Sequence, residues 1–183
     1  MIKRRTTATT PKAVAAMSPD ASSSHPHART VQAQDIADYL VAHAPWLKPF
    51  MVAAIIGAFT VESGLNPHAQ GDTNLVDHAH GLGQWRGRRW NALRNLARAQ
   101  NVDPADWKLQ LDYLLGELTT TEKYAGLHLR QAYDLPGAVD ALVDYERPGG
   151  WRVGHPREAY SWHARFDAAH RVLAQLIKET TNA

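Results

Sequence analysis

The fold is decided by the stretch Phe50-Met51-Val52-Ala53-Ala54-Ile55-Ile56-Gly57-Ala58-Phe59-Thr60-Val61-Glu62-Ser63-Gly64-Leu65-Asn66-Pro67. Its apolar part, residues 50–61, is long enough for about three helical turns, and the glycine and proline that follow indicate where the helix ends. The apolar run is too short to cross a bilayer. We therefore expect a helix that is buried in the core of a folded domain.

Glu62 is the last side chain of this expected helix. The negative end of the helix macrodipole and the scarcity of water near a core both disfavour a carboxylate, so both raise the pKa of a carboxylic acid. A glutamate that stays protonated near neutral pH is suited to act as a general acid. The alternative is a glutamate at a frayed helix end that points into solvent.

The composition narrows the classes of protein that remain. A chain of 183 residues suggests one domain plus a tail, and the absence of cysteine excludes disulfides, thiolate zinc sites and a cysteine nucleophile. The formal net charge of +2 makes the chain mildly basic, which is weak evidence for an anionic partner such as a cell wall or a nucleic acid. The basic residues Lys3, Arg4 and Arg5 are not followed by an apolar segment, so we see no secretory signal and expect no stable membrane insertion.

The chain divides into a tail, residues 1–32, and a folded domain, residues 33–183. The tail is rich in Thr, Ala, Ser, Pro and His, which predicts a disordered linker or a segment that folds on a partner. The domain is expected to be mainly α, with a long cleft loop between residues 63 and 85 that holds at most a short β-like piece. The expected helices run from about 31 to 44, 49 to 62, 89 to 99, 103 to 118, 122 to 132, 134 to 145 and 155 to 179.

Three motifs carry a family resemblance: Val61-Glu62-Ser63-Gly64-Leu65-Asn66-Pro67, Gly81-Leu82-Gly83-Gln84-Trp85 and Tyr145-Glu146-Arg147-Pro148-Gly149. Together they resemble the phage tail lysozyme family of the lysozyme-like superfamily, over roughly residues 35–160. The resemblance implies a lysozyme-like fold and cleavage of the glycan strands of peptidoglycan. It also implies that Glu62 is the catalytic acid.

Glycoside hydrolysis usually needs a second carboxyl group, and two candidates lie in the loop. Asp72 follows a glycine and resembles the aspartate that positions the attacking water in goose-type lysozymes, while Asp77 is the other candidate. Each aspartate could instead stabilise a loop turn. If neither acts, an N-acetyl group or a 6-hydroxyl of the substrate could attack, as in lytic transglycosylases, and leave an anhydro-sugar end.

Five further residues are candidates for substrate binding. Ser63 could hold the carboxyl group of Glu62 or a backbone group at the helix end. Gln84 carries an amide suited to an N-acetyl group, and Trp85 could stack on a sugar or pack in the core. Tyr145 could form a hydrogen bond in the cleft, and Glu146 could be a buried ion-pair partner or a second carboxylate that faces Glu62.

We expect no metal and no cofactor, because the spacing of His78 and His80 matches no metalloprotease motif. The arginines between residues 86 and 98 are a weak nucleic-acid signal, and we expect no nucleic-acid partner. The resemblance implies peptidoglycan as the partner, with phage tail or baseplate proteins as partners of residues 1–32. It also implies a protein that is virion-associated or delivered to the periplasm or cell wall. The alternative function is a non-catalytic structural or wall-binding module of a phage tail.

Overall fold

The computed structural model describes residues 30–71 and 77–182, and the domain in these ranges is mainly helical, as predicted. The proposed tail therefore lies almost entirely outside the described residues. A short antiparallel hairpin, β1 (Gln70–Gly71) and β2 (Ala79–His80), interrupts the helices, and a 3₁₀ turn, η1 (Pro156–Glu158), precedes the last one. The helices are α1 (Ala33–His43), α2 (Pro49–Ser63), α3 (Gly87–Gln100), α4 (Trp107–Glu117), α5 (Lys123–Gln131), α6 (Leu135–Glu146) and α7 (Trp162–Asn182).

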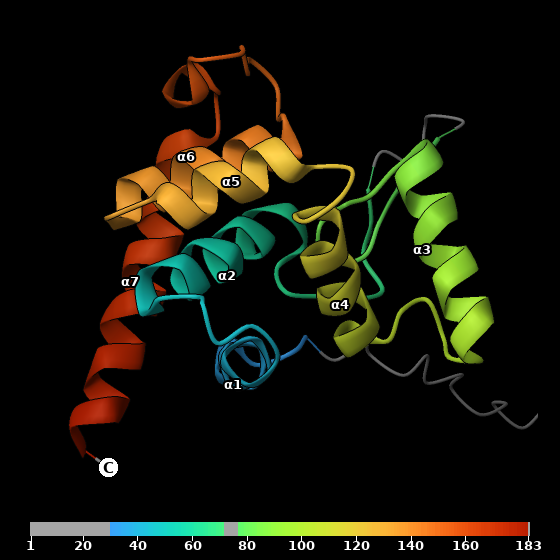
Figure 1. Ribbon diagram of the computed structural model, residues 1–183, viewed down its shortest axis with the longest axis horizontal. Coiled ribbons are helices and arrows are strands. Elements are labelled where there is room, and N and C mark those ends of the chain that lie inside the picture. The colour runs from blue at the N-terminus through green and yellow to red at the C-terminus, as the bar shows by residue number, and fades with distance from the viewer. Residues whose placement is uncertain (1–29, 72–76, 183) are drawn as a thin grey trace, which may run out of the picture.

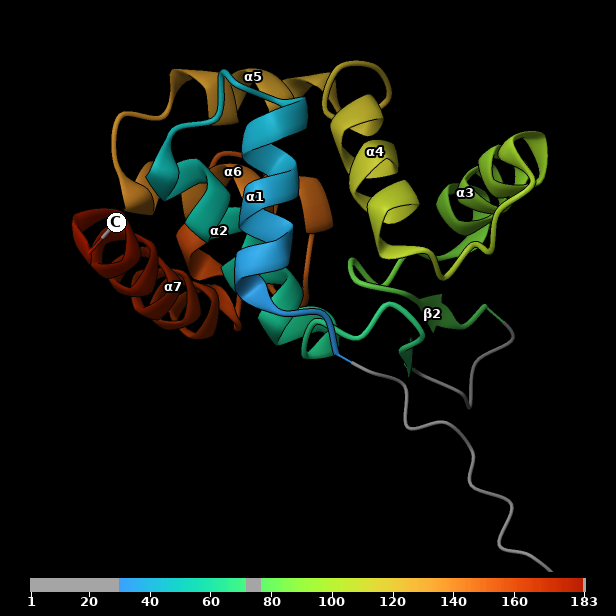
Figure 2. The ribbon, with the colours of Figure 1, turned by 90° about the horizontal axis from the view of Figure 1, so that it is seen from below.

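Helix α2 is the central element of the domain. Every residue from Met51 to Phe59 is buried, as expected for a helix that is apolar on all sides. In Figure 1, α5 and α6 lie over α2 while α7 crosses beside it, and Figure 2 shows α1 in front of α2. Both views place α3 and α4 on the side of the molecule away from α7. The hairpin and the Gly81–Trp85 turn connect these two parts.

The helix ends follow local chemistry, with two corrections. Gly64 ends α2 in the left-handed conformation (φ 61°), and the side chain of Asp134 accepts a hydrogen bond from Gly137 N at the start of α6. The predicted start of α4 near residue 103 was wrong, because the helix begins at Trp107 and Asp106 accepts from its first backbone amides. The predicted start of α7 was also wrong, because the segment at Pro156 forms η1 and the α-helix begins at Trp162.

The close contact between α2 and α7 brings Arg165 to Glu62. A Cβ atom at Gly57 would lie 2.5 Å from the backbone nitrogen of Ala169, so only glycine lets the two helices approach this closely. Arg165 lies one helical turn before Ala169 and contacts Glu62, which lies beyond Gly57 on α2. The helices therefore run antiparallel, and α7 carries a buried cation to the end of α2.

None of the helices within residues 30–71 and 77–182 is both long enough and apolar enough to cross a membrane.

Candidate active site

Two carboxyl groups meet on one buried arginine. Arg165, which is 1% exposed, donates from Nη2 to Oε1 of Glu62 and from Nε to Oε2 of Glu146 at 2.7 Å. Nε and Nη2 lie on the same edge of the planar guanidinium group, so the two carboxyl groups are held side by side. The third donor, Nη1, contacts the hydroxyl of Ser161 and so helps to hold the guanidinium in place.

The two carboxyl groups differ in their access to solvent. The side chain of Glu62 is 22% exposed, whereas that of Glu146 is only 3% exposed. Burial raises the pKa of Glu62 above its usual range, although the positive charges of Arg165 and Arg86 act against this rise. Burial also raises the pKa of Glu146, to about 7, with Arg165 opposing the rise and the neighbouring Glu62 adding to it. Glu62 is therefore the member of the pair that a ligand can reach.

Glu146 has one carboxyl oxygen without a partner. Its Oε1 atom is buried and accepts no hydrogen bond from any described residue, while Oε2 accepts from Arg165. An ionised oxygen without a hydrogen bond is costly inside a protein. The neutral form of one carboxyl group is therefore favoured, since the guanidinium charge balances only one carboxylate.

Glu62 opens onto a polar cleft of about 350 Å³. The cleft lies between the end of α2, the segment 83–89 and the segment that follows α6. Its walls present one side-chain amide, three guanidinium groups and the backbone of a turn that contains glycine. The lining residues are Glu62, Gly83, Gln84, Trp85, Arg86, Arg89, Glu146, Arg147, Pro148 and Gly149.

Gln84 is held in the cleft wall by a short turn. Paired backbone hydrogen bonds between His80 and Trp85 close the turn, and the side-chain amide of Gln84 donates to Gly81 O at 3.0 Å. A buried glutamine, Gln110, supports the turn from behind, because its Oε1 accepts from Leu82 N at 2.8 Å and its Nε2 donates to Pro67 O at 2.9 Å. The amide of Gln110 therefore joins the Gly81–Trp85 motif to Pro67, at the end of the Val61–Pro67 motif.

Trp85 and Tyr145 belong to a buried polar network instead of a sugar-binding surface. Trp85 is 1% exposed and Tyr145 is fully buried, so neither ring offers a face to a ligand. The indole Nε1 donates to Tyr145 Oη at 2.9 Å and to Glu117 Oε2 at 3.1 Å, and Tyr145 Oη donates to the same carboxylate at 2.6 Å. Arg89 completes the network with two hydrogen bonds to Glu117. Of the two alternatives left open for Trp85, the structure therefore favours packing in the core, and the hydroxyl of Tyr145 contacts Trp85 and Glu117 and no ligand-accessible surface.

The other predicted residues divide between local roles and the undescribed loop. The hydroxyl of Ser63 donates to Phe59 O at 3.0 Å, so it satisfies a backbone carbonyl of its own helix. Asp77 accepts from Gly87 N at 2.8 Å and stabilises the start of α3. Asp72 lies outside the described residues. The structure thus brings together Glu62, Gln84 and Glu146, and it adds Arg165, which the sequence reasoning missed.

Three long-range partners of the site were not expected from the sequence: Arg165, Glu117 and Gln110. Each is a buried polar residue on a helix whose inward positions are otherwise mostly apolar, and Gln110 and Glu117 share α4. A polar residue in an apolar helical stripe is a signal that such a residue has a buried partner. The sequence pattern could have indicated that these residues are paired, although it could not have named the partners.

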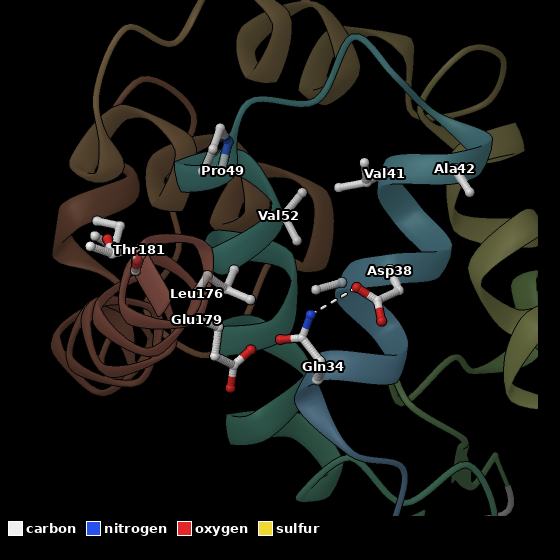
Figure 3. A pocket seen from close by; sticks show the side chains of 11 residues that line it. Gln34, Asp38, Val41, Ala42, Pro49, Val52, Leu176, Glu179 and Thr181 are labelled. Atoms are coloured by element: carbon white, nitrogen blue, oxygen red, sulfur yellow. Dashed lines mark hydrogen bonds between the residues drawn. The ribbon is translucent and has the colours of Figure 1, made fainter. Parts of the chain in front are cut away.

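Two other features of the described residues are not part of this site. No group of three or more His, Cys, Asp or Glu residues within the described ranges could hold a metal ion. A mostly apolar groove of about 840 Å³ lies between α1, the start of α2 and the end of α7 (Figure 3). Val41, Val52 and Leu176 line this groove, and Asp38 accepts a hydrogen bond from Gln34 at its edge.

A central buried helix that ends in a carboxylic acid of raised pKa, beside a polar cleft in a helical domain, defines a lysozyme-like protein. The profile of the phage tail lysozyme family matches residues 31–176, and the chain belongs to this family. No curated protein and no solved structure gives a significant match. At the level of the family, the protein is a lysozyme-like enzyme of cell-wall degradation, with peptidoglycan as the class of substrate.

Proposed function

We propose that the protein cleaves the glycan strands of peptidoglycan and that Glu62 is the general acid, which protonates the oxygen of the scissile glycosidic bond. One observation carries this proposal: the carboxyl group of Glu62 has a raised pKa and still reaches the cleft. A carboxylic acid with a raised pKa keeps its proton to a higher pH than usual and can give that proton to the leaving sugar as the bond breaks.

Glu146 and Arg165 act as positioning residues in this mechanism. Two ionised carboxylates on one guanidinium would leave one uncompensated negative charge, so the three groups favour a state with a single shared proton. Glu146 is too deeply buried to contact a sugar, and its charge acts on Glu62 through Arg165. The arginine also orients the carboxyl group of Glu62 at the cleft surface.

Substrate binding falls to the polar walls of the cleft. Gln84 is half-buried beside Glu62, and besides the N–H that donates to Gly81 O its amide has a second N–H and a carbonyl oxygen, which suit the N-acetyl group of an amino sugar. Arg86 lies at the same cleft, where its positive charge suits the anionic groups of peptidoglycan. We therefore propose Gln84 as the main contact to the sugar among the described residues.

Two routes complete the reaction after the leaving group is protonated. In a muramidase-type hydrolase, a water molecule attacks the anomeric carbon and loses a proton to a second carboxylate, for which Asp72 is our candidate. In a lytic transglycosylase, the 6-hydroxyl of the same sugar attacks the anomeric carbon, its proton passes to the carboxylate that Glu62 has become, and the product ends in an anhydro sugar. Mass spectrometry of the digest distinguishes the routes, since reducing ends report hydrolysis and anhydro ends report transglycosylation.

The substitution Glu62→Gln tests the proposal. It is close to isosteric and removes the transferable proton, so the release of soluble fragments from purified sacculi should fall by about 10²–10⁴-fold. The matched control is Glu158→Gln, which replaces a more exposed glutamate that pairs with Arg152. Activity of Glu62→Gln within about twofold of the wild type, with the protein still folded, would exclude Glu62 as the acid.

The pair Asp72→Asn and Asp77→Asn tests the second carboxylate. If Asp72 orients the water, Asp72→Asn should lose hydrolysis, and any remaining product should shift toward anhydro ends. Asp77→Asn is the matched control, because an asparagine oxygen can still accept the hydrogen bond from Gly87 N. Unaltered rate and products in both variants would favour a mechanism with a single acid.

The location and the protein partners follow from the same proposal. Because the glycan lies outside the cytoplasm, we infer that the protein is carried on a virion or delivered to the periplasm or cell wall. Residues 1–32 are then the candidate contact to phage tail or baseplate proteins. Proteomics of purified particles, compared for the full chain and a chain without residues 1–29, tests this inference.

A further inference from the structure

A second cavity of about 390 Å³ lies beside the catalytic cleft. It is built by the start of α5, the end of α6 and the segment that follows α6. The two cavities share Arg147, which lines both of them and forms an ion pair with Glu122. A ligand in the cleft could therefore extend a side branch past this arginine.

The second cavity has two aromatic rings in its wall, of which Tyr124 is largely exposed and Trp151 packs partly against the core. Tyr124 is 78% exposed although it lines the cavity, and Trp151 is half-buried opposite the guanidinium group of Arg147, 5.7 Å from its ring centre. Rings that stay exposed beside a concave surface are suited to pack against a ligand, because their apolar faces are not yet covered by protein.

The same cavity presents acidic and basic side chains. His128 Nδ1 lies 2.8 Å from Asp144 Oδ2, and Trp151 Nε1 donates to Asp144 Oδ1 at 2.9 Å. The hydrogen bond to Asp144 raises the pKa of His128, while its histidine and tryptophan partners lower the pKa of Asp144 against the effect of burial. With Arg147 and Glu122, the walls hold two pairs of acidic and basic side chains, of which Glu122 is buried and the other three remain partly exposed. Such walls suit a ligand that itself carries both an ammonium and a carboxylate.

We propose that this second cavity binds the peptide stem of peptidoglycan, a short peptide branch that carries both ammonium and carboxylate groups. This proposal rests on the proposed function, because the stem is attached to the glycan that lies in the catalytic cleft. A stem that leaves the glycan beside Glu62 has to cross the cleft rim, and Arg147 joins the cleft to a cavity with matching charges. The aromatic wall then covers the apolar part of the branch.

The test compares two substrates that differ only in the stem. One is intact soluble glycan strands with their peptides, and the other is the same strands after an amidase has removed the peptides. Tyr124→Ala should raise KM about fivefold to tenfold on the strands with stems and leave the bare strands unchanged, as expected for the truncation of one aromatic contact. Tyr124→Phe keeps the ring and should behave like the wild type.

Tyr133→Ala is the matched control, because Tyr133 is 84% exposed and lines neither cavity. A second readout does not need activity: titration with the synthetic tripeptide L-alanyl-γ-D-glutamyl-meso-diaminopimelic acid, followed by the NMR signal of the Trp151 indole N–H. The wild type and Tyr124→Phe should show a saturable shift of this signal, and Tyr124→Ala should require about five to ten times more tripeptide.

The outcomes separate this proposal from the proposed function. A loss confined to strands with stems, or tripeptide binding that depends on Tyr124, supports the stem site. The proposal is overturned if Tyr124→Ala changes KM to the same extent on both substrates and the tripeptide causes no saturable shift. If the wild type cleaves neither substrate, the proposed function fails, and the tripeptide titration alone decides whether the cavity binds a stem.

Discussion

The shared arginine makes a prediction about stability that can be tested without substrate. Glu146 has its pKa raised from an ordinary 4.5 to about 7, first by burial. A carboxyl group whose pKa is higher in the folded state stabilises the fold below its unfolded pKa, and this contribution is lost as the pH rises through the folded pKa. A shift of this size corresponds to roughly 3 kcal/mol, because each unit is worth about 1.4 kcal/mol.

The perturbation is Glu146→Gln, which removes the titrating group and keeps the shape of the side chain. Between about pH 4 and about pH 8.5, the free energy of unfolding of the wild type should fall by roughly 3 kcal/mol relative to the variant. Urea unfolding at a series of pH values measures both proteins, and the comparison cancels the other titrating groups. At alkaline pH the variant should therefore gain on the wild type, although Arg165 has lost one charged partner, because the amide oxygen of glutamine can still accept from its Nε.

The control for this experiment is Glu158→Gln, since Glu158 is a partly exposed carboxylate in a surface ion pair. Its difference from the wild type should change little with pH, as surface pairs contribute about 1 kcal/mol or less. A difference between wild type and Glu146→Gln that stays constant with pH would show that Glu146 is ionised with an ordinary pKa. That result would refute the single shared proton, and with it the proposed role of Glu146.

Three further predictions follow from the same contacts. In Glu146→Gln, the positive charge of Arg165 faces only one ionisable carboxyl group, so the pKa of Glu62 should fall and the alkaline limb of the kcat/KM profile should move to lower pH. A move to higher pH would contradict the electrostatic coupling between Glu146 and Glu62. Trp85→Phe removes two buried hydrogen bonds and should cost about 1–3 kcal/mol in urea unfolding while KM stays unchanged, whereas a raised KM would indicate a direct sugar contact. Gly57→Ala should lower stability by about 1–3 kcal/mol or more, because the added methyl group meets the backbone of α7; an unchanged melting temperature would contradict this packing.

Much of the central helix could be predicted from the sequence, because its determinants are local. An apolar run buries itself wherever it packs, and Gly64 ends the helix through its own backbone conformation. The start of α6 near residue 134 was predicted for the same reason, since the side chain of Asp134 has its partner only three residues away. The start of α7 was misjudged because Pro156 can begin a 3₁₀ turn as readily as an α-helix.

The roles of the aromatic residues could not be predicted in this way. Trp85 and Tyr145 occur in motifs that resemble a sugar-binding wall, yet their rings meet Glu117, 32 and 28 residues away along the chain. A ring that stacks on a sugar and a ring that packs in a core have the same local pattern. Only the position of α4 decides between the two, and that position depends on packing across the domain.

By itself, the sequence determined that this protein is a mainly helical domain and that an acidic residue stands at the end of its buried helix. Both follow from the order of apolar residues and from the turn residues behind them. The tertiary structure decided which groups surround that acid. Arg165 lies 103 residues away from Glu62 and reaches it because Gly57 lets α7 approach α2. The pKa of an acid depends on burial and on neighbouring charges, which exist only once distant segments have packed together.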